Sequence, residues 1–290
     1  MHLTYAPTIF ILMTSLLFSN LALANTANSQ SIETFCQDLA KKLRTVSFEG
    51  CINLNLKPSP ITSEQNRVIP FVEVLPNKET VPQGRILFIG GIHGDEYASI
   101  SLTYLWLQHL QKDFSPTPFH WLVLPLANPD GLFRNPATRA NANSVDLNRN
   151  FPSPDWDKLA IKAWKKHYNS NKRRYPGSYA SSENETQLLV SIIKSFNPDA
   201  IIAIHAPYGL LDYDGPEHAQ PDKIGHLKLR PLGTFPGSLG RYAGEYLEIP
   251  VLTLELKSAG SMPNQIEIQT MLQDLEQWVH DKIEQQELDM

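Results

Sequence analysis

The chain has 290 residues, of which 42% are hydrophobic and 19% are charged, so it is long enough to bury a full core in one sizeable domain. The net charge of −5 and the lack of long blocks of like charge give no indication of a nucleic-acid partner. The sequence shows no internal repeat and no low-complexity tract. These features exclude a repeat protein and favour a globular one.

The N-terminus reads as an export signal. Residues 8–24 are apolar and uncharged, and they end in Ala22-Leu23-Ala24, the small-x-small pattern of a cleavage site. We expect residues 1–24 to be the signal and the protein to be periplasmic or secreted. The run is short for a membrane span, yet no lysine or arginine precedes it. A membrane anchor or a buried helix therefore stays an alternative, and cleavage is left open.

Residues 25–66 form an N-terminal extension that holds an amphipathic helix over residues 32–44 and both cysteines of the chain, Cys36 and Cys51. Export to an oxidising compartment and an even cysteine count together predict a Cys36–Cys51 disulfide. The alternative is two free, buried thiols.

Residues 67–290 are expected to form one catalytic domain in which strands and helices alternate. This order predicts an α/β fold with a mixed, mostly parallel sheet and helices on both faces. Residues 132–175 read as a long polar loop, and residues 207–231 as an irregular, lid-like stretch. The expected strands are residues 67–75, 85–89, 120–126, 199–205 and 250–256, and the expected helices are residues 97–112, 185–196, 238–247 and 264–284.

A candidate metal site lies on the glycine-rich turn after strand 85–89. His93 and Glu96 are three residues apart on this turn, and His205 ends strand 199–205. Each of them alone is more often a hydrogen-bonded structural residue than a ligand. Together they form the two-histidine, one-carboxylate set of catalytic zinc, at the sheet edge where open α/β sheets bind ligands.

Further candidates follow from the same edge and from the polar loop. Glu255 ends strand 250–256, so it is either a structural carboxylate or a general base that activates water. Asn148 and Arg149 pair an amide with a planar guanidinium, which suits a two-point grip on a carboxylate. Arg139 is a candidate for stabilising an oxyanion. The alternative is that these are ordinary surface residues.

Several landmarks occur together in a fixed order, and with them the chain resembles the zinc carboxypeptidase family, or funnelins. The resemblance implies a mixed sheet of about eight strands flanked by helices, and one Zn²⁺ ion bound by His93, Glu96 and His205. It also implies Glu255 as general base, Asn148 and Arg149 on a substrate carboxylate, and Arg139 on the scissile carbonyl. The landmarks are His93-Gly94-Asp95-Glu96, Asn128-Pro129-Asp130-Gly131, Arg139, Asp146-Leu147-Asn148-Arg149-Asn150-Phe151, His205 and Glu255.

Within the family, the sequence is most similar to bacterial murein peptide amidases. This resemblance implies a peptide substrate, cut between γ-D-glutamate and meso-diaminopimelate or at a C-terminal residue. Those amidases are typically cytoplasmic, whereas this chain carries an export signal. The substrate-binding tyrosine of digestive carboxypeptidases has no clear counterpart, and Tyr208 and Tyr213 are the candidates.

Two other functions stay open. Acylamino-acid deacylases of the aspartoacylase and succinylglutamate desuccinylase group share the Asp-Leu-Asn-Arg loop and the zinc ligands. A non-catalytic, cell-wall-binding relative would have kept the fold alone. The sequence predicts no nucleic-acid partner and no stable membrane insertion after signal removal, and it leaves the oligomeric state open.

Overall fold

The structure is a computed structural model that describes residues 31–76, 81–111 and 117–288. The predicted export signal, residues 1–24, lies outside the described residues. Among the described residues, no helix combines the length and the apolar character needed to cross a membrane.

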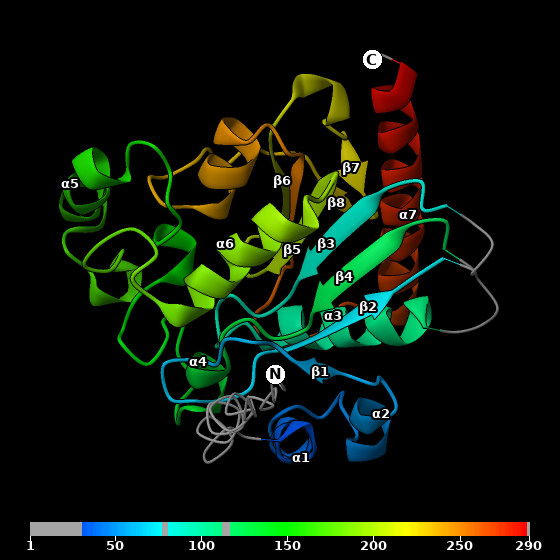
Figure 1. Ribbon diagram of the computed structural model, residues 1–290, viewed down its shortest axis with the longest axis horizontal. Coiled ribbons are helices and arrows are strands. Elements are labelled where there is room, and N and C mark those ends of the chain that lie inside the picture. Colours follow the sequence, from blue (N-terminus) through cyan, green and yellow to red (C-terminus); the bar gives the residue numbers. More distant parts are fainter. Residues whose placement is uncertain (1–30, 77–80, 112–116, 289–290) are drawn as a thin grey trace, which may run out of the picture.

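A seven-stranded sheet runs through the centre of the described part of the chain (Figure 1), in the order β1-β2-β4-β3-β5-β9-β6. The four strands β4, β3, β5 and β9 are parallel, and β2 and β6 flank them antiparallel. The predicted mixed, mostly parallel sheet is confirmed, and β7 and β8 form a separate ladder. The strands are β1 (Lys57–Pro58), β2 (Pro70–Val74), β3 (Arg85–Ile89), β4 (His120–Leu124), β5 (Ala200–His205), β6 (Leu210–Asp214), β7 (Lys223–Ile224), β8 (Leu227–Lys228) and β9 (Val251–Glu255).

Helices cover both faces of this sheet because the central strands are apolar on both sides, as in sheets built by β-α-β crossovers. One buried cluster joins the sheet to α1, α2, α3 and α7, and the other joins it to α6 and the π-helical segment η4. The α-helices are α1 (Ile32–Lys42), α2 (Phe48–Ile52), α3 (Tyr97–Leu110), α4 (Pro129–Phe133), α5 (Trp156–Tyr168), α6 (Asn184–Phe196) and α7 (Gln265–Leu288). Three short 3₁₀ helices among the described residues are η1 (Leu147–Arg149), η2 (Lys172–Arg174) and η3 (Glu217–Ala219), and the π-helical segment η4 spans Gly240–Tyr246.

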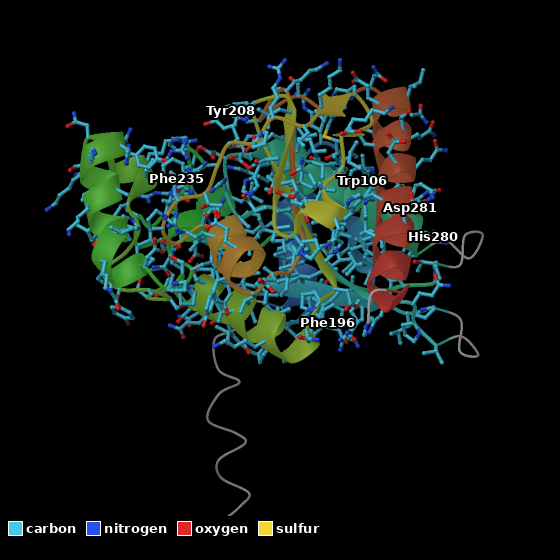
Figure 2. The ribbon with its side chains drawn as sticks, turned by 90° about the horizontal axis from the view of Figure 1, so that it is seen from above. Trp106, Phe196, Tyr208, Phe235, His280 and Asp281 are labelled. Carbon is cyan, nitrogen blue, oxygen red and sulfur yellow. A yellow bond between two sulfur atoms is a disulfide. The ribbon has the colours of Figure 1, made fainter. Side chains whose placement is uncertain are left out.

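Aromatic side chains fill the core between the sheet and α3. Phe88 on β3 lies 5.8 Å from Trp106 and 6.5 Å from Trp121, measured between ring centroids. Trp106 lies beside α7 (Figure 2), and both tryptophans are almost fully buried. Truncating a buried aromatic of this kind to alanine typically costs about 3–5 kcal/mol.

The N-terminal extension packs into the same core. Cys36 in α1 and Cys51 in α2 form a disulfide, and both are fully buried. Phe35 also packs edge-to-face on Phe133 at the end of α4, with ring centroids 6.1 Å apart. The disulfide and this contact hold α1 and α2 against the body of the protein.

Three expectations, two about irregular stretches and one about a helix, need correction. Residues 207–231 are not wholly irregular, because they contain the edge strand β6. In β6, aspartates alternate with the buried Leu211 and Tyr213, which lowered the apolar signal. Residues 132–175 contain α5, where only Trp156 and Ala160 are buried, so its apolar stripe was weak. The helix expected at residues 238–247 is the π-helical η4.

Candidate active site

The predicted site residues lie at the carboxyl ends of parallel strands. His93 follows β3, His205 is the last residue of β5, and Glu255 is the last residue of β9. His205 and Glu255 are direct partners in the register of β5 and β9, so their backbones are about 4.8 Å apart. The topology therefore brings together residues that are far apart in the sequence.

Glycine makes the turn that carries His93 and Glu96 possible. Gly91 has a φ of +62°, a conformation that residues with a Cβ rarely adopt. Gly94 packs on the backbone of α4, where an added Cβ would lie 2.2 Å from the carbonyl carbon of Gly131. The turn thus reaches its shape only with small residues, and α4 fixes it from outside.

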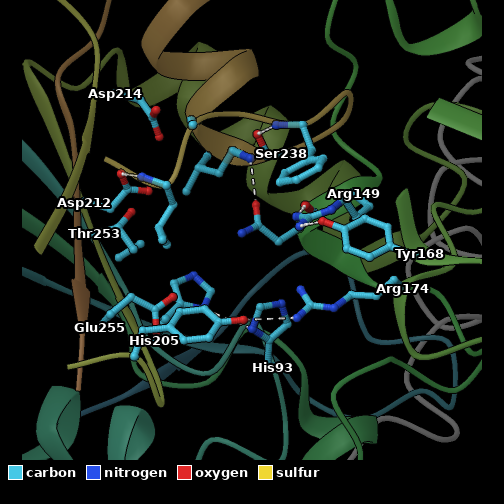
Figure 3. A pocket seen from close by; sticks show the side chains of 18 residues that line it. His93, Arg149, Tyr168, Arg174, His205, Asp212, Asp214, Ser238, Thr253 and Glu255 are labelled. Atoms are coloured by element: carbon cyan, nitrogen blue, oxygen red, sulfur yellow. Dashed lines mark hydrogen bonds between the residues drawn. The ribbon is translucent and has the colours of Figure 1, made fainter. Parts of the chain in front are cut away.

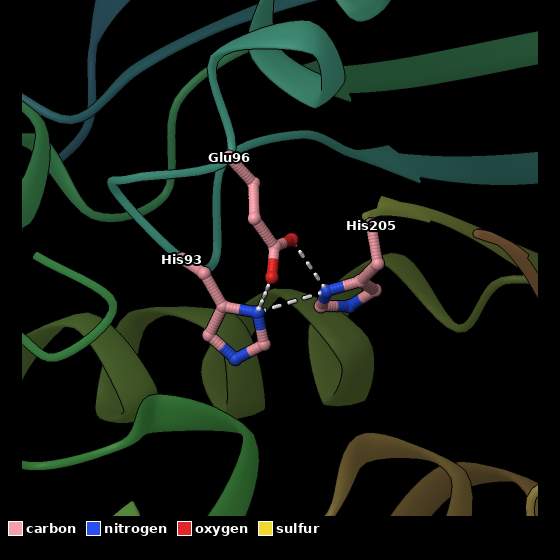
Figure 4. A group of neighbouring side chains, drawn as sticks. All are labelled: His93, Glu96 and His205. Carbon is pink, nitrogen blue, oxygen red and sulfur yellow. Dashed lines mark hydrogen bonds and ion pairs between the residues drawn. The ribbon is translucent and has the colours of Figure 1, made fainter. Parts of the chain in front are cut away.

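The side chains of His93, Glu96 and His205 converge on one point (Figure 4). Nδ1 of His93 lies 2.8 Å from Oε1 of Glu96 and 3.0 Å from Nδ1 of His205. Nδ1 of His205 lies 3.1 Å from Oε2 of Glu96, and all three residues are buried. Two imidazole nitrogens and a carboxylate are thus delivered to a single small space.

Two residues of the polar loop support this group from behind. Oδ1 of Asp146 lies 3.1 Å from Nε2 of His93, and Oδ2 accepts a 2.8 Å hydrogen bond from Nε of Arg139. A carboxylate on the second ring nitrogen fixes the tautomer and orientation of a metal-binding histidine. Asp146 is not among the site residues predicted from the sequence, although it belongs to the Asp-Leu-Asn-Arg motif.

The charges of this group compensate one another. Burial alone would raise the pKa of Glu96, but His93 and His205 hold that pKa well below its usual range. Burial likewise opposes ionisation of Asp146, and Arg139 outweighs it and keeps the Asp146 pKa low. Burial and Arg139 lower the pKa of His93. These directions favour ionised carboxylates and a neutral His93, the form in which a histidine binds a metal. Burial opposes the charged form of His205 as well, but Glu96 outweighs it and raises the pKa of His205.

Glu255 faces the same space. It is 7% exposed, and its Oε2 atom is buried with no hydrogen-bond partner among the described residues. Burial raises the pKa of its carboxyl group. A carboxylate with one oxygen free and a raised pKa is suited to accept a proton from water.

A pocket of 270 Å³ opens beside these residues (Figure 3). It is lined at one end by His93, His205 and Glu255, and farther along by Asn148 and Arg149 of η1. Asn148 and Arg149 can hold a substrate carboxylate, which places the adjoining amide bond beside His93, His205 and Glu255.

Neighbouring segments hold the two residues of η1 in place. Oδ1 of Asn148 accepts a 2.8 Å hydrogen bond from the backbone of Leu239. The guanidinium of Arg149 donates to the hydroxyl of Tyr168 at 3.0 Å and lies over the ring of Phe235, 4.6 Å from its centroid. Arg149 is thus preorganised, and Tyr168 is a pocket residue that the sequence analysis missed.

Three further residues can be placed relative to the pocket. Arg139 does not line it, because its guanidinium is engaged with Asp146 and with Glu96, 3.4 Å away. Tyr213 is buried and donates to the carbonyl of Pro216, so it is not a pocket residue. Tyr208 lines the pocket and is exposed (Figure 2), which leaves it as the tyrosine candidate. Arg174, 3.4 Å from the Tyr208 hydroxyl, was not anticipated.

The residues present fit a zinc ion. The donor atoms are two imidazole nitrogens and carboxylate oxygens within reach of one another, which is the donor set of catalytic rather than structural zinc. Asp146 supplies the outer support such sites have.

A second group of carboxylates, Glu64, Glu183 and Glu185, also lies close together. Here amides are the partners: Nδ2 of Asn141 donates to Glu183 at 2.7 Å and to Glu185 at 3.1 Å. Burial raises the pKa of Glu185 to about 7. Among the described residues, no histidine joins this group, and its carboxylates are already hydrogen-bonded.

Solved structures share the fold. Murein-tripeptide amidase from Escherichia coli O157 matches with a TM-score of 0.53 and 23% identity, over 75% of this chain and 88% of that one. Bovine thrombin-activatable fibrinolysis inhibitor, in complex with tick carboxypeptidase inhibitor, matches with a TM-score of 0.60 and 14% identity, over 91% of this chain and 99% of that one. At these identities the likeness extends to the fold alone.

Sequence relatives are similar over more than half of the chain. Murein peptide amidase A of Vibrio campbellii is 32% identical over 180 residues, which cover 59% of this chain and 69% of the relative. The protein of the same name from Escherichia coli K12 is 28% identical over 170 residues, 58% of this chain and 59% of the relative. The zinc carboxypeptidase family model matches residues 59–228, and Glu255 lies beyond that match, where β9 places it. The chain belongs to the zinc carboxypeptidase family.

Proposed function

We propose that this protein is an exported zinc peptidase that hydrolyses an amide bond in the stem peptides of murein, at the D-glutamate–diaminopimelate bond or at a C-terminal residue. One observation carries the proposal: His93, His205, Glu255 and Arg149 line a single pocket. A metal group, a base and an anchor for a carboxylate are what hydrolysis next to a free carboxylate requires.

The residues have distinct roles. When bound by His93, Glu96 and His205, Zn²⁺ supplies Lewis-acid chemistry that polarises a carbonyl and lowers the pKa of water. Glu255 accepts the proton of the attacking water and passes it to the leaving amine. Arg149, with the amide of Asn148, holds the carboxylate on the leaving-group side.

In this mechanism Arg139 acts from outside the pocket, through its contacts with Glu96 and Asp146. Its guanidinium is buried against Asp146 and Glu96. There it offsets the negative charge of these two carboxylates, and it adds positive potential where the oxyanion develops.

The substrate and the location rest on separate support. The relatives in Vibrio campbellii and Escherichia coli are named murein peptide amidases. Export is supported by the apolar segment of residues 8–24 and by the buried Cys36–Cys51 disulfide, since disulfides persist in oxidising compartments.

The test is hydrolysis by the purified, zinc-loaded protein. The substrates are L-Ala-γ-D-Glu-meso-diaminopimelate, peptides with free C-termini, and succinylglutamate as the deacylase alternative, and mass spectrometry identifies the products. We expect cleavage of the murein tripeptide and a fall in kcat of about 10²–10⁴-fold for Glu255→Gln, with zinc content unchanged.

The matched control is Glu73→Gln, which changes an exposed carboxylate on β2 whose partner is His120. It should retain wild-type activity. Cleavage of succinylglutamate alone, or equal rates for wild type and Glu255→Gln, would overturn the proposal. Export is tested by fractionating cells that produce the full chain, and recovery from the cytoplasm alone would contradict it.

A further inference from the structure

One segment of the chain concentrates positive charge that the proposed mechanism does not use. Residues 156–174, which span α5 and η2, contain seven lysines and arginines and a single acidic residue, Asp157. The chain as a whole has a net charge of −5, so this segment is opposite in sign to the protein that carries it. Two of the seven cations are engaged at the active site, because Arg173 pairs with Asp95 and Arg174 lines the pocket.

Four of the other five cations lie on one face of α5, here called the lysine face: Lys158, Lys162, Lys165 and Lys166. Their spacing of i, i+4, i+7 and i+8 places side chains on one stripe of a helix. The opposite side of α5 holds Trp156 and Ala160, which are buried against the protein. All four lysines are exposed, so the stripe points to solvent.

The lysine face lacks compensating negative charge. None of its four lysines forms an ion pair with a carboxylate of the residues that the structure describes. Lys162 is four residues from both Lys158 and Lys166, and like charges at this spacing destabilise a helix. The helix dipole favours lysines in the last turn but opposes Lys158, which lies in the first turn. The pattern therefore does not serve the helix itself, and it is complementary to an anionic partner.

The helix that carries the lysine face also forms a wall of the active-site pocket. Tyr168, the last residue of α5, accepts a 3.0 Å hydrogen bond from Arg149 and lines the pocket. Nε1 of Trp164 donates to the carbonyl of Asn171 at 2.8 Å, which ties the start of η2 to α5. At about 1.5 Å per residue, the lysine face extends along the helix from roughly 3 Å to roughly 15 Å away from Tyr168.

These dimensions and charges favour an extended polymer that bears carboxylates. A single amino acid in the pocket is too short to reach along the whole face, whereas a polymer that enters the pocket passes beside it. The face offers only the compact ammonium groups of lysine, without the arginine forks that favour nucleic-acid phosphates. A helix that lies on a membrane buries its apolar side in lipid, but the apolar side of α5 is buried in the protein.

We infer that the lysine face of α5 binds the carboxylates of neighbouring stem peptides in polymeric murein while one stem peptide occupies the pocket. The inference rests on the proposed function, because it takes murein as the polymer that enters the pocket. The γ-linked glutamate and the diaminopimelate of each stem peptide supply free carboxylates at repeated positions. The lysine face should therefore add affinity for the polymer and none for a free tripeptide.

The first test is co-sedimentation with purified murein sacculi. Zinc-loaded protein with Glu255→Gln is used, so that the polymer stays intact. We expect binding at 0.1 M NaCl and its loss at 1 M, since the Debye length falls from about 10 Å to about 3 Å. Replacing the four lysines of the lysine face by glutamine should weaken binding about tenfold or more, because the facing potentials are no longer complementary.

The matched control replaces four other exposed lysines by glutamine, with the same change in net charge: Lys57, Lys194, Lys223 and Lys228. These lysines lie on β1, α6, β7 and β8, and none of them lines the pocket. The strands β7 and β8 are on the far side of the molecule from α5 (Figure 1). The control should bind sacculi within about twofold of the parent protein, and circular dichroism verifies the fold of both variants. Equal binding by the two variants would overturn the inference.

Two further ligands identify the anion. Sacculi whose carboxylates have been converted to neutral amides should lose the contribution of the lysine face, and undiminished binding to them would overturn the inference. Vesicles of phosphatidylglycerol test a membrane surface instead. Tighter binding to these vesicles than to sacculi, with the loss confined to the lysine-face variant, would also overturn the inference and assign the face to lipid.

A kinetic arm, with Glu255 intact, separates the inference from the proposed function. The lysine-face variant should match the wild type in kcat/KM on the soluble tripeptide within about twofold and release peptides from sacculi about tenfold more slowly. Equal rates on both substrates overturn the inference and leave the peptidase activity intact. Salt-sensitive binding through the lysine face without hydrolysis of any peptide supports the inference and contradicts the proposed function.

Discussion

Two clusters of potential metal ligands in the described residues, His93–Glu96–His205 and Glu64–Glu183–Glu185, differ in the charge that surrounds a buried glutamate. Around Glu96, two histidines and Arg139 lie within ion-pair distance, and the Glu96 pKa is held well below its usual range. Around Glu185, the partners are the amide of Asn141 and a backbone amide, and the pKa rises to about 7. Burial opposes ionisation at both sites, so the difference lies in the compensating positive charge.

The cluster around Glu96 is suited to bind a cation, whereas the cluster around Glu185 is a structural hydrogen-bond network. Carboxylates that remain ionised while buried keep their lone pairs for a metal ion, and the nearby imidazoles supply the nitrogen donors. Carboxylates that share amide donors lock the polar loop of residues 141–143 onto the start of α6. The same residue type thus serves binding in one place and packing in the other.

The largest effect, on the zinc content, is expected from removing one of the metal ligands around Glu96. His205→Ala should reduce bound zinc from about one ion per chain to near zero, because two donors do not make a zinc site. Elemental analysis after dialysis measures this. The matched change in the second group, Glu183→Gln, should retain zinc, and loss of zinc in that variant would erase the distinction between the groups.

The second effect is on the pH dependence of the free energy of unfolding. The Glu185 pKa is about 7 in the folded protein, against a usual value of 4.5, so the folded state binds the proton more tightly than the unfolded state. The stabilisation is complete below about pH 4.5 and declines as the pH rises to about 7. The shift of about 2.5 units corresponds to at most about 3 kcal/mol in the free energy of unfolding.

Glu185→Gln removes this titration. Denaturant unfolding at pH 5 and pH 8 should therefore show that the variant gains stability relative to the wild type as the pH rises. A difference between the two proteins that is the same at both pH values would show that Glu185 does not titrate in this window.

A smaller effect, on zinc affinity, is expected from changing Asp146, which contacts the metal ligand His93. Asp146→Asn removes the negative charge that supports His93, and loss of such a partner typically weakens metal binding about 10–100-fold. Competition with a chromogenic chelator measures the affinity. Asp199→Asn, at the opposite end of β5 where the carboxylate accepts from the backbone of Arg85, is the control and should bind zinc like the wild type.

The smallest effect is expected at the rim of the site, where the ion pair of Arg173 and Asp95 is partly exposed. Arg173→Ala should change the free energy of unfolding by no more than about 1 kcal/mol, since solvent screens such pairs. A loss of several kcal/mol on denaturant titration would mean that this pair behaves like the buried groups.

The residues at strand ends could be predicted from the sequence because the signal is local. His205 follows an uninterrupted apolar run, Glu255 follows an apolar run interrupted only by Thr253, and parallel strands bring such ends together. Asp146 had no such signal, because its contact with His93 spans 53 residues and depends on the path of the loop. Asp212 and Asp214 were not predicted, because they lie on the short edge strand β6, whose aspartates lowered its apolar signal.

The backbone register that places Glu255 beside His205 has a consequence for divergence. The base and one metal-binding histidine are fixed by main-chain hydrogen bonds between β5 and β9, so their spacing is independent of the loops that shape the pocket. Loops around the pocket can accumulate substitutions without changing the spacing of Glu255 and His205, whereas residues 235–239 also hold Asn148 and Arg149 in place. Substrate selectivity can therefore change during evolution while the spacing of Glu255 and His205 stays the same.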